Sequence, residues 1–248
     1  MELLLMLDAA RDASARRTTA VIPYYAYARS DKKDAPRISI AGRLVADLLN
    51  TAGANRVLTM TLHAPQVHGF FRVPVDHLNA LNTFSTYFRD RDLSNTVVVS
   101  PDLGNAKSAS HLARLLNLPV AAGSKRRIDD EHVVIERIVG DVTSRNVIVL
   151  DDEIANGGTT LELLRLLREQ QVGTIAVACT HGLFTGSAIV RLAAQSDLRE
   201  VVTTNTVPVP ATKSEALPQL RVLSVAPLLA EAIQRIHDGE SISSLFDV

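Results

Sequence analysis

The stretch V-I-V-L-D-D-E-I-A-N-G-G-T-T-L-E-L-L-R-L-L, from Val147 to Leu167, decides how the rest of the chain is interpreted. Four apolar residues lead into Asp151 and Asp152, a loop with two glycines and two threonines follows, and leucines then recur at helical spacing. This pattern predicts a strand, a loop and a helix. Because the first N–H groups of a helix lack intrahelical acceptors and its dipole is positive there, the loop is a predicted anion site.

The paired acids suggest what the anion belongs to. Asp151 and Asp152 lie at the carboxyl end of the predicted strand, where they can accept hydrogen bonds from vicinal hydroxyls or hold a divalent cation. A ligand whose phosphate binds the loop and whose vicinal hydroxyls bind the acids would be a ribose 5-phosphate. The alternative is an ordinary strand-to-helix turn, since Asp, Gly and Thr also cap and turn well. The residue order is neither that of a P-loop nor that of a dinucleotide fingerprint, which excludes ATP binding by a P-loop here.

Composition narrows the class of protein. The 248 residues leave room for one large or two small domains, and a hydrophobic content of 46% is ample for a core. A net charge of -1 gives no reason to expect nucleic acid or membrane partners. The single cysteine, Cys179, excludes intrachain disulfides and is predicted to be a buried strand residue. No apolar run approaches a membrane span, so we expect a cytoplasmic protein.

Other predicted strands also end in polar residues. The strand Arg56 to Leu62 leads to His63, and the strand Thr96 to Ser100 leads to Asp102 and a helix start. In doubly wound sheets ligands bind outside the carboxyl ends of the strands, so both side chains are site candidates. For His63 a structural, hydrogen-bonded role is an equal alternative. The segment Tyr24 to Arg37, rich in Tyr, Arg, Lys and Asp, is a functional loop or a solvated charge run.

A second segment with basic residues, G-S-K-R-R-I-D-D-E-H, carries Lys125, Arg126 and Arg127 before three acids. Without further context it indicates an exposed hairpin of balanced charge. Weak similarity between T-M-T-L-H-A-P-Q-V-H-G-F-F and V-A-C-T-H-G-L-F-T-G-S-A predicts two related α/β halves. The chain opens with an amphipathic helix, Met1 to Ala15, rather than a strand, so we expect that the natural domain begins earlier or that this is a shortened form.

Taken together, these motifs resemble ribose-phosphate pyrophosphokinases. The resemblance rests on Y-A-R-S-D-K-K-D, T-L-H-A-P-Q-V-H-G-F-F, S-P-D-L-G, K-R-R, the D-D loop, T-H-G-L-F-T-G-S-A and the tail from V-L-S-V-A-P-L-L-A, in that order over nearly the whole chain. It implies an α/β fold of two phosphoribosyltransferase-like domains, each a mostly parallel sheet flanked by helices. We expect residues 1–75, completed by 226–248, to form the first domain and residues 76–225 the second.

The resemblance also implies an activity. Members of the family transfer a pyrophosphoryl group from MgATP to the 1-hydroxyl of ribose 5-phosphate, which gives phosphoribosyl pyrophosphate and AMP. The implied cofactor is Mg²⁺, the implied partners are ATP and ribose 5-phosphate, and assembly into homo-oligomers from dimer to hexamer is expected.

Residue roles follow from the resemblance, position by position. The ATP-binding candidates are Arg29, Ser30 and Asp31, the magnesium candidates are His63 and Asp102, and the catalytic candidates, on a flap that closes over the triphosphate, are Lys125 and Arg127. The ribose 5-phosphate candidates are Asp151, Asp152, Ala155, Asn156, Gly157, Gly158 and Thr159.

Departures from the family pattern keep two alternatives open. Ala155 and Asn156 replace the usual Asp and Thr of the phosphate loop, Thr61 replaces an Asp before the metal histidine, and Ser30 replaces a Gln. The family also carries an N-terminal segment before the point where this chain starts. These differences favour a non-catalytic relative that assembles with full-length synthetase subunits. A phosphoribosyltransferase is the third possibility, although no segment for a base-binding hood is evident.

Overall fold

The computed structural model describes residues 1–127 and 133–246; the side chains of residues 125–134 lie outside the description. Contacts divide the chain into two units. Unit 1 comprises Met1–Asn79 with Ser243–Phe246, and unit 2 comprises Ala80–Ile242. The predicted boundary between residues 75 and 76 lies four residues earlier, and the terminal helix counts with unit 2 rather than with the first domain.

Unit 1 is built on a parallel sheet with the strand order β1-β2-β3 among the described residues. The strands are β1 (Thr19–Ile22), β2 (Arg56–Met60) and β3 (Val75–Leu78), and the helices are α1 (Glu2–Asp12), α2 (Ala41–Thr51) and the 3-10 helix η1 (Pro65–Phe70). Strand β2 is central, and Val57 and Leu58 are fully buried in it. The 3-10 helix η2 (Ser243–Leu245) also belongs to this unit.

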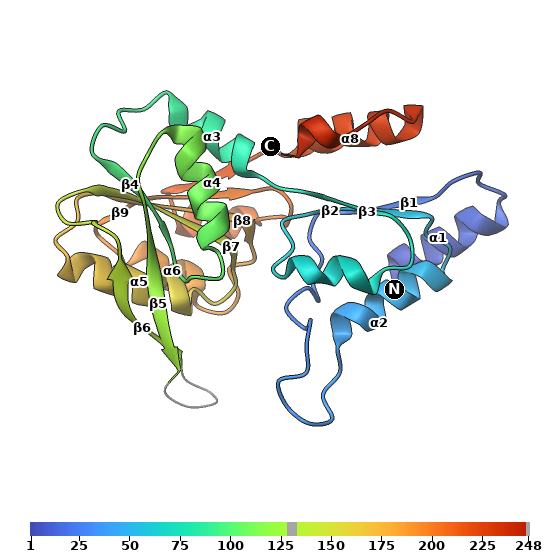
Figure 1. Cartoon of the computed structure of the whole chain (residues 1–248), viewed down its shortest axis with the longest axis horizontal. Helices are drawn as coiled ribbons and strands as arrows, with labels where there is room; N and C mark the ends of the chain where they lie inside the picture. The colour runs from blue at the N-terminus through green and yellow to red at the C-terminus, as the bar shows by residue number, and fades with distance from the viewer. Residues whose placement is uncertain (128–132, 247–248) are drawn as a thin grey trace. The chain divides into compact units, whose positions relative to one another are not determined.

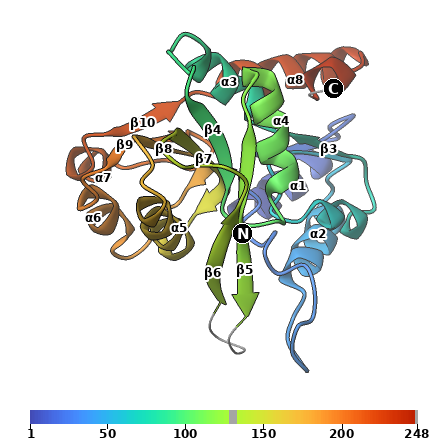
Figure 2. The same cartoon turned by 60° about the vertical axis from the view of Figure 1, so that its left-hand side comes forward.

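Unit 2 contains a larger sheet with the order β10-β9-β8-β7-β4-β5-β6 (Figures 1 and 2). Every neighbouring pair is parallel except β5 with β6. The strands are β4 (Thr96–Ser100), β5 (Val120–Arg127), β6 (Val133–Val139), β7 (Asn146–Ile154), β8 (Ile175–Gly182), β9 (Leu198–Thr204) and β10 (Leu220–Leu223). The helices are α3 (Leu81–Arg89), α4 (Ala106–Leu116), α5 (Gly158–Glu169), α6 (Ala188–Ala193), α7 (Ala211–Ala216) and α8 (Ala226–Asp238). Helices α4 and α5 lie on opposite faces of the sheet (Figure 2).

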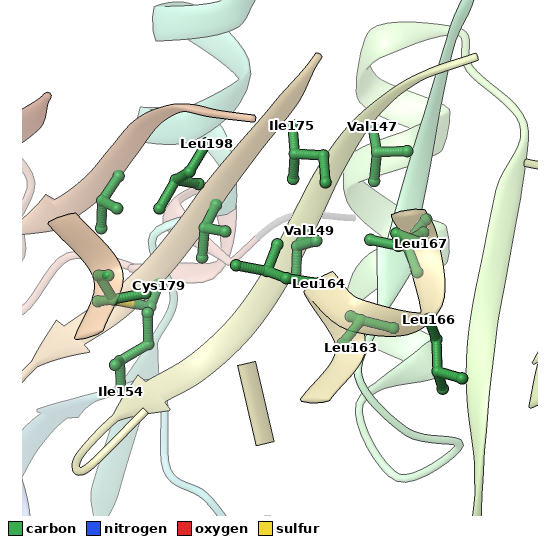
Figure 3. Close-up of a cluster of buried hydrophobic side chains, with 14 of the residues drawn as sticks. Val147, Val149, Ile154, Leu163, Leu164, Leu166, Leu167, Ile175, Cys179 and Leu198 are labelled. Atoms are coloured by element: carbon green, nitrogen blue, oxygen red, sulfur yellow. The ribbon is translucent and has the colours of Figure 1, made fainter. Parts of the chain in front are cut away.

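The central strands are apolar on both faces because helices cover both. Val147 and Val149 point into one cluster with Leu163, Leu164 and Leu167 of α5 (Figure 3). Their neighbour Ile148 is also buried but is not part of that cluster. Fully buried parallel strands therefore appear as continuous apolar runs, as V-I-V-L does.

Two sequence predictions change in the structure. Strand β7 continues past Asp151 and Asp152, the predicted carboxyl end, to Ile154, because Glu153 and Ile154 still pair with His181 and Gly182 of β8. Strand β3 and helix α7 are not predicted by the sequence pattern, and α7 buries none of its residues. Cys179 is fully buried in β8, as predicted. Among the described helices, none has both the length and the apolar character that a bilayer crossing requires.

Candidate functional site

The sequence-predicted acids of unit 2 meet where the strand order reverses. The chain runs from β4 outward to β5 on one side, and from β7 outward to β8 on the other. Asp102 follows the carboxyl end of β4 and Asp151 lies near the carboxyl end of β7, which is the next strand in the sheet. Ligands of doubly wound sheets bind at such a switch point, outside the carboxyl ends of the strands.

The phosphate loop, which we call the cradle (Ala155–Thr159), is held by backbone hydrogen bonds. The N–H of Thr185 donates to the carbonyl of Ala155 at 2.8 Å, and the side-chain oxygen of Asn156 accepts from the N–H of Gly158 at 3.0 Å. Gly157 is the N-cap of α5 with φ 74°, a left-handed conformation that favours glycine. Asn156 thus uses one of the amino-terminal N–H groups of α5, so the predicted anion site rests on the N–H groups that remain in the first turn.

Asp151 and Asp152 precede the cradle and lie near the carboxyl end of β7, before its last residues Glu153 and Ile154. Burial, and then the neighbouring charges of Asp152 and Asp102, raise the pKa of Asp151 well above its usual range. The backbone N–H of Asp152 donates to the Asp151 carboxylate at 2.9 Å. The ionised form of Asp151 is therefore disfavoured here, and a hydroxyl donor or a cation would stabilise it.

The Asp102 loop is the third part of the unit 2 site. The Asp102 carboxylate accepts a hydrogen bond from the N–H of Asn105 at 3.0 Å, and its carbonyl accepts one from the Ser100 hydroxyl at 2.6 Å. A Cβ on Gly104 would lie 3.1 Å from that carboxylate, so a glycine at this position leaves it room. The loop is folded closely around the carboxylate of a single acid.

Lys125 and Arg127 lie at the end of β5, in an antiparallel hairpin with β6 that runs beyond the rest of the unit 2 sheet (Figure 1). The predicted hairpin is therefore confirmed at the level of the backbone, while its turn and the side chains of both cations lie outside the described residues. At the base of the hairpin a Cβ on Gly123 would lie 2.5 Å from the carbonyl oxygen of Pro101. The base of the hairpin thus packs directly against the Asp102 loop.

The ATP-binding candidates belong to unit 1. The Ser30 hydroxyl accepts from the N–H of Ala41 at 3.0 Å and so satisfies a donor at the start of α2. Asp31 accepts from the side chain of Gln66, and the side chain of Arg29 is exposed. Ser30 therefore has a clear structural role at the start of α2.

The candidate metal ligand His63 is exposed at the end of β2. The residue before it, Leu62, donates its N–H to Nε2 of His77 at 2.7 Å, and Thr61 donates its N–H to the carbonyl of Leu78 at 2.8 Å. Thr61 has a φ of 42°, which is unusual for a β-branched residue. His77, which no sequence motif singles out, thereby fixes the backbone that presents His63.

The residues present fit magnesium only together with a substrate. Among the described residues no group of three or more His, Cys, Asp or Glu side chains is arranged to hold a metal ion. Mg²⁺ commonly takes one or two protein carboxylates and completes its shell with water and substrate phosphates. The oxygen donors around Asp102 suit that mode of binding.

Comparisons with known proteins agree with this architecture. Residues 1–53 match the N-terminal domain of ribose phosphate pyrophosphokinase, and residues 129–247 match the phosphoribosyl synthetase-associated domain. A ribose-phosphate pyrophosphokinase of Deinococcus radiodurans is 54% identical over 249 residues, which cover 99% of this chain and 78% of the relative. The chain belongs to the ribose-phosphate pyrophosphokinase family.

Two further relatives support the assignment. A Streptomyces coelicolor protein, provisionally named for the same activity, is 63% identical over 247 residues, which cover 100% of this chain and 77% of the relative. The crystal structure of phosphoribosylpyrophosphate synthetase from Mycobacterium smegmatis matches 96% of this chain and 78% of that chain with a TM-score of 0.88 and 43% identity. The predicted family, the α/β fold and the assignment as an enzyme of this family are confirmed.

Some contacts of the site could not be anticipated from sequence. Three side chains each support a candidate segment through a hydrogen bond to backbone that is distant in sequence. They are Asn105, bonded to β7, Glu162, bonded to the hairpin, and His77, bonded to the residue before His63. Asn105 lies within the S-P-D-L-G-N-A motif, which was a usable signal, whereas nothing in the sequence marks Glu162.

Proposed function

We propose that this chain catalyses the transfer of the terminal diphosphate of MgATP to the 1-hydroxyl of ribose 5-phosphate. The observation that supports it most is the convergence, at one switch point of unit 2, of a phosphate cradle, three acidic side chains and the base of the hairpin that carries Lys125 and Arg127. The 1-hydroxyl oxygen attacks the β-phosphorus of ATP and loses its proton. The bond from the β-phosphorus to the oxygen bridging to the α-phosphorus breaks, and AMP leaves with that oxygen.

Each part of the site has a role in this reaction. Asp151 and Asp152 accept hydrogen bonds from the ribose hydroxyls, and the cradle binds the 5-phosphate through the N–H groups that open α5. Lys125 and Arg127 neutralise charge that develops on the transferred group, and Arg29, Ser30 and Asp31 bind ATP. In such transfers the protein forms few or no covalent bonds with the substrates, so positioning and electrostatic stabilisation supply most of the catalysis.

Magnesium belongs to this proposal as a cofactor, with Asp102 as its candidate ligand in unit 2 and His63 as a candidate ligand in unit 1. When bound, it shields the negative charge of the triphosphate. We further propose a cytoplasmic location and assembly into homo-oligomers.

The test is the formation of AMP from MgATP by the purified protein, with and without ribose 5-phosphate, and with ³¹P NMR to identify the second product. Ribose-dependent AMP together with phosphoribosyl pyrophosphate is expected, and material purified from cells with an empty vector gives the background. AMP formation without dependence on ribose 5-phosphate would overturn the proposal. No AMP, with ribose 5-phosphate still bound in calorimetry, would also overturn it and would favour the non-catalytic relative that Ala155 and Thr61 suggest.

A further inference from the structure

Asn105 makes an unusual use of its side chain. It is the N-cap residue of α4, a position where an asparagine side chain ordinarily accepts a hydrogen bond from the first turn of the helix. Here the side chain makes no capping bond, and its Nδ2 instead donates to the carbonyl of Leu150 at 2.9 Å.

The acceptor of this bond lies immediately before the paired acids. The parallel register of β4 with β7 runs from Thr96 with Asn146 to Val99 with Val149 and ends there. The next carbonyl of β7 is that of Leu150. It accepts the hydrogen bond from the side chain of Asn105, which lies in the loop that follows β4. The side chain thereby continues the connection between the two strands beyond the last ladder pair.

The same residue also holds the acid of the neighbouring loop. The backbone N–H of Asn105 donates to the Asp102 carboxylate at 3.0 Å. One residue therefore binds Asp102 through its backbone and the strand of Asp151 through its side chain. The two bonds fix the separation of the two acidic segments on either side of the switch point.

We propose that Asn105 is a positioning residue that sets the Asp102 carboxylate relative to Asp151 and Asp152 and so sets the affinity of the site for the divalent cation. This inference rests on the proposed function, in which Asp102 binds magnesium. Asn105 acts through Asp102 and the β7 backbone.

The variants are Asn105→Ala and Asn105→Ser, and the matched control is Asn95→Ala. Asn95 precedes β4 and donates its Nδ2 to the carbonyl of Ser144 at 2.8 Å, so it joins the same two strands at their amino ends. Truncating it removes the same kind of hydrogen bond away from the acids. Serine is a favoured N-cap residue but is too short to replace the Asn105 bond, so it decides the question if the alanine variant does not fold.

Two measurements test the proposal. The first is Mn²⁺ binding followed by water-proton relaxation, with ribose 5-phosphate and α,β-methylene-ATP present. The second is amide hydrogen exchange of residues 100–106 in the ligand-free protein. For the Asn105 variants we expect Mn²⁺ affinity to fall and exchange to accelerate by roughly three- to tenfold each, the scale set by one lost hydrogen bond. For Asn95→Ala both values should stay within about twofold of the original protein.

Unchanged Mn²⁺ affinity in a folded Asn105 variant would overturn the positioning role, whether or not exchange accelerates. An equal loss of affinity in Asn95→Ala would overturn it as well, because general loosening of β4 against β7 would then be the cause. If the original protein binds Mn²⁺ but forms no AMP, the proposed function fails while the comparison of the variants still decides the role of Asn105.

Discussion

The cradle and the hairpin leave the same edge of the unit 2 sheet but are built differently. The cradle is closed by backbone hydrogen bonds to the segment after β8, and α5 begins directly behind it. The hairpin has a β4 partner only as far as Ala122, and from there on β5 pairs with β6. A preformed cradle suits the binding of a phosphate that does not react, whereas an arm that continues beyond its β4 partner suits groups that act on the transferred one.

The largest effect that separates the two regions is expected for Lys125→Ala. We expect kcat to fall at least about a hundredfold, because a cation that stabilises developing charge would be lost from the transition state. The affinity for ribose 5-phosphate, measured by calorimetry, should change less than about twofold, because the cradle does not include this residue.

Arg126→Ala is the control for this prediction. Arg126 has a positive charge and lies between Lys125 and Arg127 on the same strand, so its loss reports the effect of net charge alone. A similar fall of kcat in both variants, or a loss of ribose 5-phosphate binding in Lys125→Ala, would contradict the separate roles of the hairpin in catalysis and of the cradle in binding.

The opposite pattern, a loss of ribose 5-phosphate affinity with little change in kcat, is expected for Gly157→Ala in the cradle. Its added Cβ meets no close atom, since the nearest neighbours lie at 3.8 Å, but its φ of 74° strains any other residue. We expect the affinity for ribose 5-phosphate to fall about tenfold, in line with a left-handed strain of roughly 1–2 kcal/mol, with kcat at saturation little changed.

Gly239→Ala provides the matched control, because Gly239 at the end of α8 has a φ of 75° and a Cβ added there would have no atom within 4 Å. Both variants should lose similar stability in thermal unfolding, and only Gly157→Ala should lose affinity. Equal affinities in the two variants would show that the cradle tolerates the change of backbone.

The sequence allowed much of this arrangement to be predicted, and the reasons differ by region. The apolar run before Asp151 specified a buried strand, and the placement of acids after two strands specified the binding edge. The extension of β7 to Ile154 depends on pairing with β8, and the Asn105 bond joins residues separated by 45 positions. Such contacts depend on tertiary structure, which local pattern does not contain. Strand β3 was missed because Asp76 within V-D-H-L obscures the apolar pattern, although that acid forms an ion pair with Arg56 in the fold.

A smaller effect concerns the pH dependence of the protein's stability, through the acid that precedes the cradle. Because the pKa of Asp151 is raised, the folded protein retains a proton that the unfolded chain releases between the ordinary pKa of an aspartate, about 3.9, and the raised value. The free energy of unfolding therefore falls as pH rises through that window. Asp151→Asn does not titrate, so it should raise the ligand-free melting temperature at neutral pH, and the gain should vanish near pH 4.

The control for this pH effect is Asp92→Asn, which should not raise the melting temperature, since hydrogen bonds from Ser94 lower the pKa of Asp92. A gain for Asp151→Asn that persists at pH 4 would point to packing instead of charge.

The smallest effect tests whether a hydrogen bond between α5 and the hairpin couples the hairpin to the cradle. Glu162 of α5 accepts a hydrogen bond from the N–H of Ile135 in β6 at 3.0 Å, and Ile135 pairs with Lys125, so the helix that begins at the cradle also holds the hairpin opposite Lys125. Glu162→Ala should lower kcat roughly two- to fivefold while leaving ribose 5-phosphate affinity unchanged, as expected for one lost hydrogen bond. Glu162→Gln keeps the accepting oxygen and should retain most of the activity, and Glu169→Ala, which removes an exposed ion pair with Arg165 on the same helix, should have no effect on kcat. If Glu162→Ala instead weakened ribose 5-phosphate binding and spared kcat, the bond would serve the cradle, and the hairpin would act independently of α5.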